Sequence, residues 1–180
     1  MDLRVKRTTK SIKDAFFELR KKKRLEKISV KELSELAMIN KATFYLHYRD
    51  IYELSDKLEN ELIDKIIAEV KPINILNTTT GFRAFFRSIS MAIINNEKDI
   101  QILFSGYDAN RFINLFETRL KRFIFSAYPN IKNNSENNIL ISFIVQGSFH
   151  SYIRNNKIDK SVVVDRTTDL TLKLTEEYTV

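Results

Sequence analysis

The sequence predicts an all-α protein in two parts: an N-terminal three-helix head and a C-terminal helical bundle, joined by a long helix. Apolar residues recur at helical spacing along most of the chain. Short polar segments separate these stretches, and their lengths suit the loops of a helix bundle. The apolar fraction of 43% is sufficient for a core.

Basic charge is concentrated in the first part. Residues 1–49 hold 14 Lys and Arg against 6 Asp and Glu, a net charge of +8. Residues 50–180 hold 16 against 17, a net charge of −1. This split is typical of a nucleic-acid-binding module joined to a neutral one, so we expect domains over 1–49 and 50–180.

The head begins with a basic segment, residues 1–7, that has no periodicity. We expect a frayed arm whose cations either remain solvated or reach DNA phosphates or a minor groove: Arg4, Lys6 and Arg7. A helix should follow from Thr8 or Thr9. Its apolar face consists of Ile12, Ala15, Phe16 and Leu19.

Two short helices joined by a turn are expected next. Ser29 is an N-cap for the first, and Glu32 completes a capping box. Asn40 caps the second, over residues 41–48, in which Phe44 and Tyr48 should face inward. The residues left near the surface are Lys41, Ala42, Thr43, Tyr45 and His47. This is the spacing of a helix-turn-helix, although a purely structural helical hairpin would show the same periodicity.

The stretch Ser29 to Leu54, and above all its segment KATFYLHY, resembles the DNA-binding region of the TetR family of bacterial transcriptional regulators. The resemblance implies that Thr43, Tyr45 and His47 lie on or beside DNA, with Tyr and His on phosphates. Lys can address guanine or phosphate, and a Thr methyl can contact the thymine methyl. The residues expected to bind double-stranded DNA are Ser29, Lys31, Asn40, Lys41, Ala42, Thr43, Tyr45, His47 and Arg49.

Two positions depart from the family pattern. Met38 stands where the family usually has a glycine in the turn, and a positive φ at a non-glycine residue costs roughly 1 kcal/mol. Ile51 stands where a phosphate-contacting lysine is common. That contact is therefore either lost or supplied by Arg49.

A long helix should follow over residues 50–70, capped by Asp50 with Glu53 in a second capping box and ended by Pro72. By resemblance it links the head to the body and carries its motion. A polar segment, 74–81, should separate it from the helices of the body, which are expected over 82–95, 99–104, 109–128, 135–155 and 160–178. In the last, Leu170, Leu172 and Leu174 alternate as in a strand, but a helix is preferred because no partner strand is expected elsewhere.

The body is rich in phenylalanine, and aromatic stripes at helical spacing usually form core. Because the TetR family often has an inducer pocket here, the resemblance makes five residues candidates for its lining: Phe85, Phe86, Phe104, Phe112 and Phe116. It also implies a dimer interface on the last two long helices, formed around Gly147, Ser148, Ser151 and Tyr152. Gly147 could equally relieve crowding within the chain.

The residues that catalysis or cofactor binding would need are missing from the sequence. Cysteine is absent, the three glycines are isolated, and no motif has metal-ligand spacing. His150 lies in an apolar helix, as a core or interface histidine would. We therefore expect no enzymatic activity, no cofactor and no metal. The chain has no apolar run of 18 residues and no N-terminal signal pattern, which predicts a cytoplasmic protein without a membrane partner.

The expected function is sequence-specific DNA binding by a transcriptional regulator, which in this family is usually a repressor. It is expected to act as a homodimer on a palindromic operator and to be controlled by a small apolar or amphipathic effector. In an alternative, the body binds a protein partner instead of a small molecule. A dry body without a cavity would favour that alternative. A remote possibility is a helical enzyme of unrecognised type.

Overall fold

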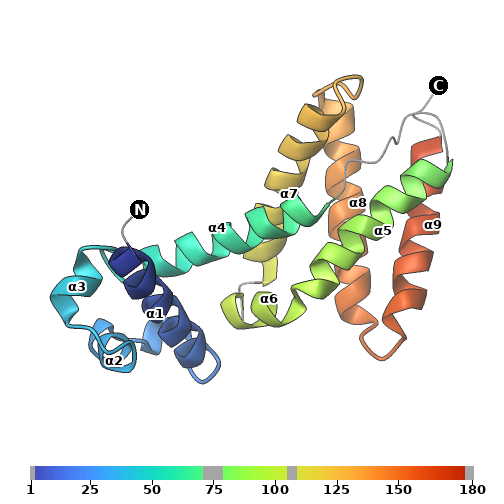
Figure 1. Ribbon diagram of the computed structural model, residues 1–180. Coiled ribbons are helices and arrows are strands. Elements are labelled where there is room, and N and C mark those ends of the chain that lie inside the picture. Colours follow the sequence, from blue (N-terminus) through green and yellow to red (C-terminus); the bar gives the residue numbers. More distant parts are fainter. Residues whose placement is uncertain (1–2, 71–78, 105–108, 177–180) are drawn as a thin grey trace. The chain divides into compact units, whose positions relative to one another are not determined.

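The computed structural model describes residues 3–70, 79–104 and 109–176. All regular structure in these ranges is helical, which confirms the all-α class (Figure 1). The elements in chain order are α1 (Leu3–Arg20), the short 3₁₀ helix η1 (Leu25–Lys27), α2 (Val30–Leu36), α3 (Lys41–Tyr45), α4 (Ile51–Glu69), α5 (Thr79–Asn95), α6 (Glu97–Leu103), α7 (Ala109–Ala127), α8 (Ser135–Arg154) and α9 (Lys160–Glu176).

Two helix boundaries in the N-terminal part differ from those expected. α1 begins at Leu3, so the predicted frayed arm is wrong for residues 3–7, which contain no proline or glycine and are helical. α3 ends at Tyr45 instead of residue 48. The chain tightens there, because the backbone N–H of His47 donates to the carbonyl of Phe44, three residues back, at 2.9 Å.

The C-terminal segment is a helix, as preferred. Leu172 is buried whereas Leu170 is 62% exposed, so the alternating leucines follow helical faces. The hydroxyl of Thr168 donates to the carbonyl of Val164 at 2.7 Å, a bond within the helix. The expected extension of this helix to residue 178 lies outside the described residues. α5 begins at Thr79, three residues earlier than expected.

The chain divides into two compact units. The first comprises Met1–Leu62 and Lys98–Phe112, and the second comprises Ile63–Glu97 and Ile113–Val180. Helices α4 and α7 each contribute residues to both units. The first unit therefore contains the segment expected to be the head together with the first part of α4, most of α6 and the start of α7.

In the first unit, α1 packs on α2 and α2 packs on α3. The core residues with no exposed surface are Ile12, Phe16, Leu33, Phe44, Leu54 and Phe112. Phe44 and Tyr48 face inward as predicted, with their ring centroids 5.7 Å apart. Burial of a side chain such as Phe44 is worth roughly 1.5–3 kcal/mol, so these two rings hold the short helix α3 in place.

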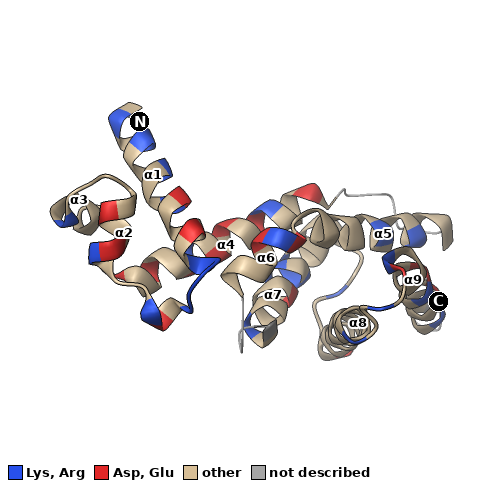
Figure 2. Cartoon of the chain, turned by 90° about the horizontal axis from the view of Figure 1, so that it is seen from below, with Lys and Arg blue, Asp and Glu red and all other residues tan. Residues whose placement is uncertain are grey.

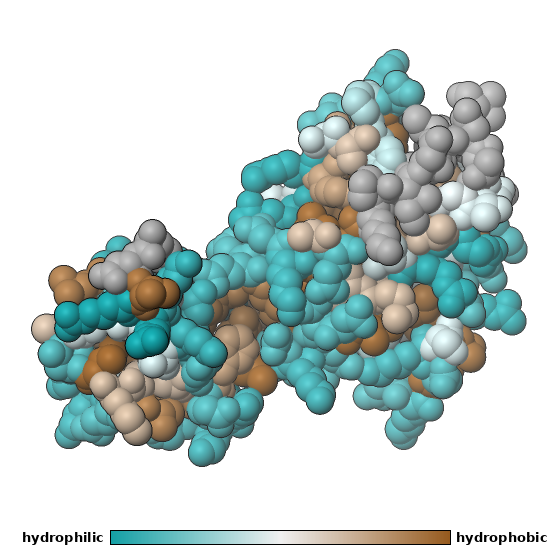
Figure 3. Space-filling model, in the orientation of Figure 1, coloured by the Kyte–Doolittle hydropathy of each residue, from teal (hydrophilic) through white to brown (hydrophobic). Residues whose placement is uncertain are grey.

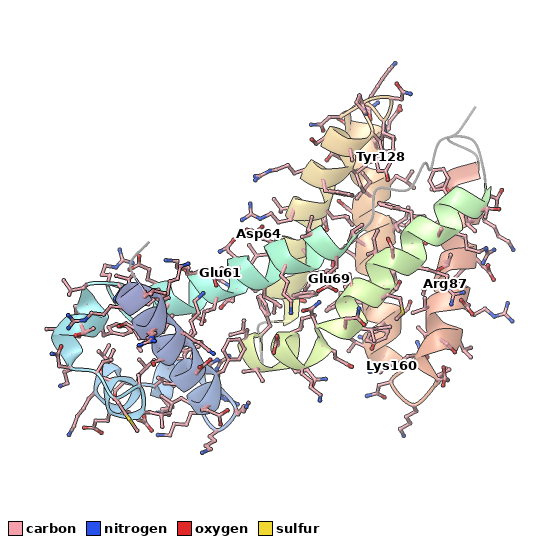
Figure 4. The ribbon with its side chains drawn as sticks, viewed as in Figure 1. Glu61, Asp64, Glu69, Arg87, Tyr128 and Lys160 are labelled. Atoms are coloured by element: carbon pink, nitrogen blue, oxygen red, sulfur yellow. The ribbon has the colours of Figure 1, made fainter. Side chains whose placement is uncertain are left out.

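In the second unit, α9 packs on both α5 and α8. Two ion pairs join α5 to α9: Arg83 with Asp169 at 2.7 Å, and Arg87 with Asp165 at 3.3 Å. Figure 4 labels Arg87 on α5. Exposed pairs of this kind contribute about 0–1 kcal/mol each. They therefore define the register of the two helices more than they stabilise the unit. None of the helices in the described ranges combines the length and the apolar character needed to cross a membrane.

Candidate nucleic-acid interface

α2 begins at an N-cap that forms only half of the predicted capping box. The hydroxyl of Ser29 accepts a hydrogen bond from the backbone N–H of Glu32 at 3.2 Å. The carboxylate of Glu32 does not return to the backbone of Ser29 but pairs with Lys23 at 2.6 Å. A nearby cation therefore replaces the expected backbone donor.

The turn after α2 has the hydrogen bonds of a Schellman cap. The N–H of Met38 donates to the carbonyl of Glu35 at 3.2 Å, and the N–H of Ile39 donates to the carbonyl of Ser34 at 3.0 Å. Met38 adopts a φ of 55°, the left-handed conformation expected at this position. Its side chain is 93% exposed, so packing does not offset the backbone cost of roughly 1 kcal/mol.

α3 is capped by Asn40, as predicted. The side-chain oxygen of Asn40 accepts from the backbone N–H of Thr43 at 2.7 Å and from its hydroxyl at 2.8 Å. The hydroxyl proton of Thr43 is therefore committed to the cap, and the methyl group remains for a partner. Asn40 thus caps α3, and it is also one of the residues expected to bind DNA.

The outer face of α3 and of the residues that follow is exposed. Lys41, Ala42 and Tyr45 are exposed, while Thr43 and His47 are partly exposed. Sequence reasoning missed Leu46, which is 83% exposed and extends this face. The available signal was its place between Tyr45 and His47 in the FYLHY segment. Ser29 and Lys31 are also exposed, on α2 and its cap.

The start of α4 supplies one further cation. Asp50 accepts from the backbone N–H of Glu53 at 2.8 Å, and this bond, with help from Arg49, holds the pKa of Asp50 below its usual value. The carboxylate of Glu53 accepts from the backbone N–H of Arg49 at 2.6 Å, one residue before the expected partner. Ile51 is buried, whereas the side chain of Arg49 is 81% exposed. Arg49 is therefore an exposed cation at this end of the face, and its Nε atom pairs with the carboxylate of Asp50 at 3.2 Å.

Charge in the first unit is unevenly spread (Figure 2). Lys and Arg colour the N-terminal end of α1, whose first turn contains no acidic residue. Because a helix N-terminus is itself positive, an anion would be favoured there. Apolar side chains also reach the surface of this unit (Figure 3). Exposed aliphatic residues near α2 and α3 include Leu36, Met38 and Leu46.

The second unit contains a small cavity between α5, α7, α8 and α9, with a volume of about 90 Å³. Of the five candidate lining residues, Phe86 and Phe116 line it. Phe85 instead packs against Tyr128 with ring centroids 5.7 Å apart. Phe104 and Phe112 pack against each other at 5.3 Å in the core of the first unit. These three residues belong to the core and do not line the cavity.

The candidate dimer residues on α8 separate onto different faces. Ser148 and Tyr152 line the cavity, and the hydroxyl of Tyr152 lies 3.4 Å from a carboxylate oxygen of Glu97. Gly147 is exposed, and a Cβ added to it would meet no atom within 4 Å. Crowding within the chain therefore does not explain this glycine. Ser151 is partly exposed.

Gly147 belongs to an outward face of α8 that is largely apolar. Ile139 and Phe143 are 69% and 64% exposed, and they line a shallow groove together with Gly147 and His150. The Nδ1 atom of His150 lies 2.9 Å from the carbonyl of Gln146, one turn earlier. His150 is exposed, so it is not a core residue of the described chain.

No protein-family model matches the chain, and no curated protein matches it either. Within the described ranges, no group of three or more His, Asp and Glu side chains lies close enough together to hold a metal ion.

Proposed function

We propose that this protein is a DNA-binding transcriptional regulator of the kind that its sequence resembles, the TetR family. In this proposal α2 and α3 form a helix-turn-helix whose second helix enters the major groove. The protein acts as a homodimer on a palindromic operator, most simply as a repressor, and an effector controls its release.

One observation carries the proposal: α3 has a buried side, and its opposite side is exposed or partly exposed among the described residues. Phe44 and Tyr48 anchor the helix from within, so the opposite side is presented rigidly. On that side, the ammonium group of Lys41 can bind guanine or a phosphate. The methyl group of Thr43 can contact the methyl group of thymine, and the hydroxyl of Tyr45 can bind a phosphate. The net charge of +8 over residues 1–49 supports the same partner.

The outward face of α8 supports a homodimer. An exposed apolar face on a helix is stabilised when a second surface covers it. Two copies related by a two-fold axis would cover the same face on each subunit and present two equivalent copies of α3. Such a pair matches the two half-sites of a palindrome.

A second candidate is a regulator whose body receives a protein instead of a small molecule. The volume of about 90 Å³ favours it, because drug-sized ligands occupy roughly 300 Å³ or more. The first candidate then requires either a small effector or a cavity that expands on binding.

The test is a DNA titration with the full-length protein. The upstream DNA of its own gene would be searched for an inverted repeat, and that fragment compared with a scrambled one. Lys41→Ala and Thr43→Ser should each reduce the preference for the operator by about 1–3 kcal/mol, since each removes a base contact. Thr43→Ser keeps the hydroxyl that bonds Asn40 and removes only the methyl.

Tyr45→Phe and His47→Ala should weaken binding to both DNAs by similar factors, because phosphate contacts carry no sequence information. Lys173→Ala, which removes an exposed cation on α9, is the matched control and should change neither affinity. Circular dichroism checks folding. If all four head variants fold and bind as the wild type does, α3 is not the recognition helix and the proposal fails.

A further inference from the structure

The wall of the cavity in the second unit is mostly apolar. Among the described residues, those that line it come from α5, α7, α8 and α9, and none of them carries a charge. Aliphatic and aromatic side chains make up most of the wall, among them Ile89, Ile93, Ile113, Phe116, Ile144 and Val164. A charged ligand would lose its hydration here without finding a counter-ion.

The threonines of α9 add to this apolar character although each has a hydroxyl. Thr167 donates to the carbonyl of Val163 at 2.8 Å, and Thr168 donates to that of Val164 at 2.7 Å. Thr171 donates to the carbonyl of Thr167 at 2.8 Å. Their protons are thus committed within the helix. We expect these threonines to offer a ligand no donor proton.

Two serines in the wall differ from the threonines. Ser90 on α5 and Ser148 on α8 line the cavity, and neither hydroxyl has a hydrogen-bond partner within the described part of the chain. Other helical serines of the protein do have one: Ser88 donates to the carbonyl of Phe85, and Ser142 donates to the carboxylate of Glu117. The hydroxyls of Ser90 and Ser148 are therefore available to a bound molecule.

The volume limits the size of that molecule. An engineered apolar cavity of roughly 150 Å³ in another protein stays dry and binds benzene or xenon. At about 90 Å³, the present cavity, which is partly open to solvent, has room for about a single small ring.

We propose that this cavity binds a neutral, mostly apolar molecule of about one ring that carries one hydroxyl or carbonyl group, and that Ser90 or Ser148 hydrogen-bonds that group. The role of such a molecule as the effector rests on the proposed DNA-binding function. Its binding to the cavity is independent of that function.

The experiment compares three probes, phenol, benzene and benzoate, by thermal shift and calorimetry on the full-length protein without DNA. Phenol should bind most tightly, benzene more weakly and benzoate not at all. The double variant Ser90→Ala/Ser148→Ala should lose the preference for phenol over benzene, a change of about 3- to 10-fold, since one neutral hydrogen bond is removed. It should still bind benzene, because the cavity remains.

A matched pair on α9 tests the location. Val164→Phe should fill the cavity and abolish binding of phenol and benzene, whereas Val162→Phe, whose side chain points outward and is 49% exposed, should leave both unchanged. Binding that survives Val164→Phe, or a phenol preference that survives the serine variant, would overturn the proposal. So would a wild type that binds none of the neutral probes. If Val164→Phe fails to fold by circular dichroism, the serine variant decides.

Failure of the proposed DNA-binding function can be distinguished from failure of the proposed cavity site. If phenol binds the wild type as described but the operator affinity is absent or insensitive to phenol, the cavity site stands and its role as the effector site is wrong.

Discussion

The guanidinium of Arg20 donates a hydrogen bond from Nη2 to the backbone carbonyl of Leu103, at a distance of 2.9 Å. Arg20 lies at the end of α1 and Leu103 at the end of α6, within the first unit. Only 4% of Arg20 is exposed, so the bond forms away from water. A cation at the last carbonyls of a helix also complements its dipole. One side chain therefore joins α6 to the segment proposed to bind DNA.

Arg20→Lys should lower the free energy of unfolding by about 1–3 kcal/mol, because a buried charge loses a bond that the planar guanidinium is shaped to make. Urea denaturation measures the change. Lys21→Ala, at the exposed neighbouring position, should change it by less than about 0.5 kcal/mol. Equal stability of Arg20→Lys and wild type would show that the bond to α6 contributes nothing.

Tyr48→Phe should stabilise the protein by about 1 kcal/mol. The residue is 2% exposed, and its hydroxyl has no hydrogen-bond partner among the described residues. Burial raises the pKa of Tyr48, and the carboxylates of Glu61 and Glu53 add to the effect. Removing a buried, unpaired hydroxyl removes its desolvation cost while the ring contact with Phe44 remains. Thermal and urea unfolding should agree. Tyr45→Phe, at an exposed position, is the control, and a loss of stability in Tyr48→Phe would contradict the assignment.

Glu117 should make the stability depend on pH. Burial raises the pKa of this carboxyl, but hydrogen bonds from Lys121, Ser142 and Gln146 outweigh burial and hold it below the usual value. The carboxylate therefore contributes stability that is fully present above the unfolded pKa of about 4.3 and is lost as the pH falls through the lower folded pKa.

Glu117→Gln should consequently be less stable than wild type at neutral pH, and the difference should shrink as the pH is lowered below about 4. Urea denaturation at a series of pH values tests this. Glu35→Gln, at an exposed position on α2, should show no comparable convergence. A constant difference between Glu117→Gln and wild type at every pH would mean that packing, not charge, is responsible.

Gly147→Leu should weaken the proposed dimer by at least about tenfold while leaving the subunit folded. A Cβ added at this position meets no described atom of its own chain within 4 Å, so a weaker dimer would indicate that this position contacts a second subunit. Analytical ultracentrifugation gives the dissociation constant, and Gly147→Ala should have a smaller effect. A wild type that is monomeric at micromolar concentration would contradict the dimer outright.

The local features of the first unit were predictable because they depend on residues close in the sequence. Asn40 caps α3, and the four-residue spacing of Phe44 and Tyr48 places both on the buried side. Contacts between distant segments have no comparable pattern in the sequence from which they could be predicted. The bond from Arg20 to Leu103 spans 83 residues, and neither residue has a pattern that indicates the other.

The faces of α8 were not predictable for a different reason. Apolar residues occur on both its buried and its exposed sides: Val145 is buried, whereas Phe143 is exposed. Periodicity therefore could not tell which side faces α5 and α9. The dimer interface around Ser148 and Tyr152 therefore stays a prediction, and the structure shows that both residues line the cavity.

The conformation of Met38 makes it a suitable site for a spectroscopic label. The chain has no cysteine, so Met38→Cys would introduce a unique thiol that a fluorophore can modify. Cysteine and methionine are both unbranched at Cβ, so the left-handed backbone at φ 55° should cost the same for either. With 93% of the native side chain in solvent, the dye would stand beside α3 without disturbing the core, and its emission would report directly whether a nucleic acid approaches that helix.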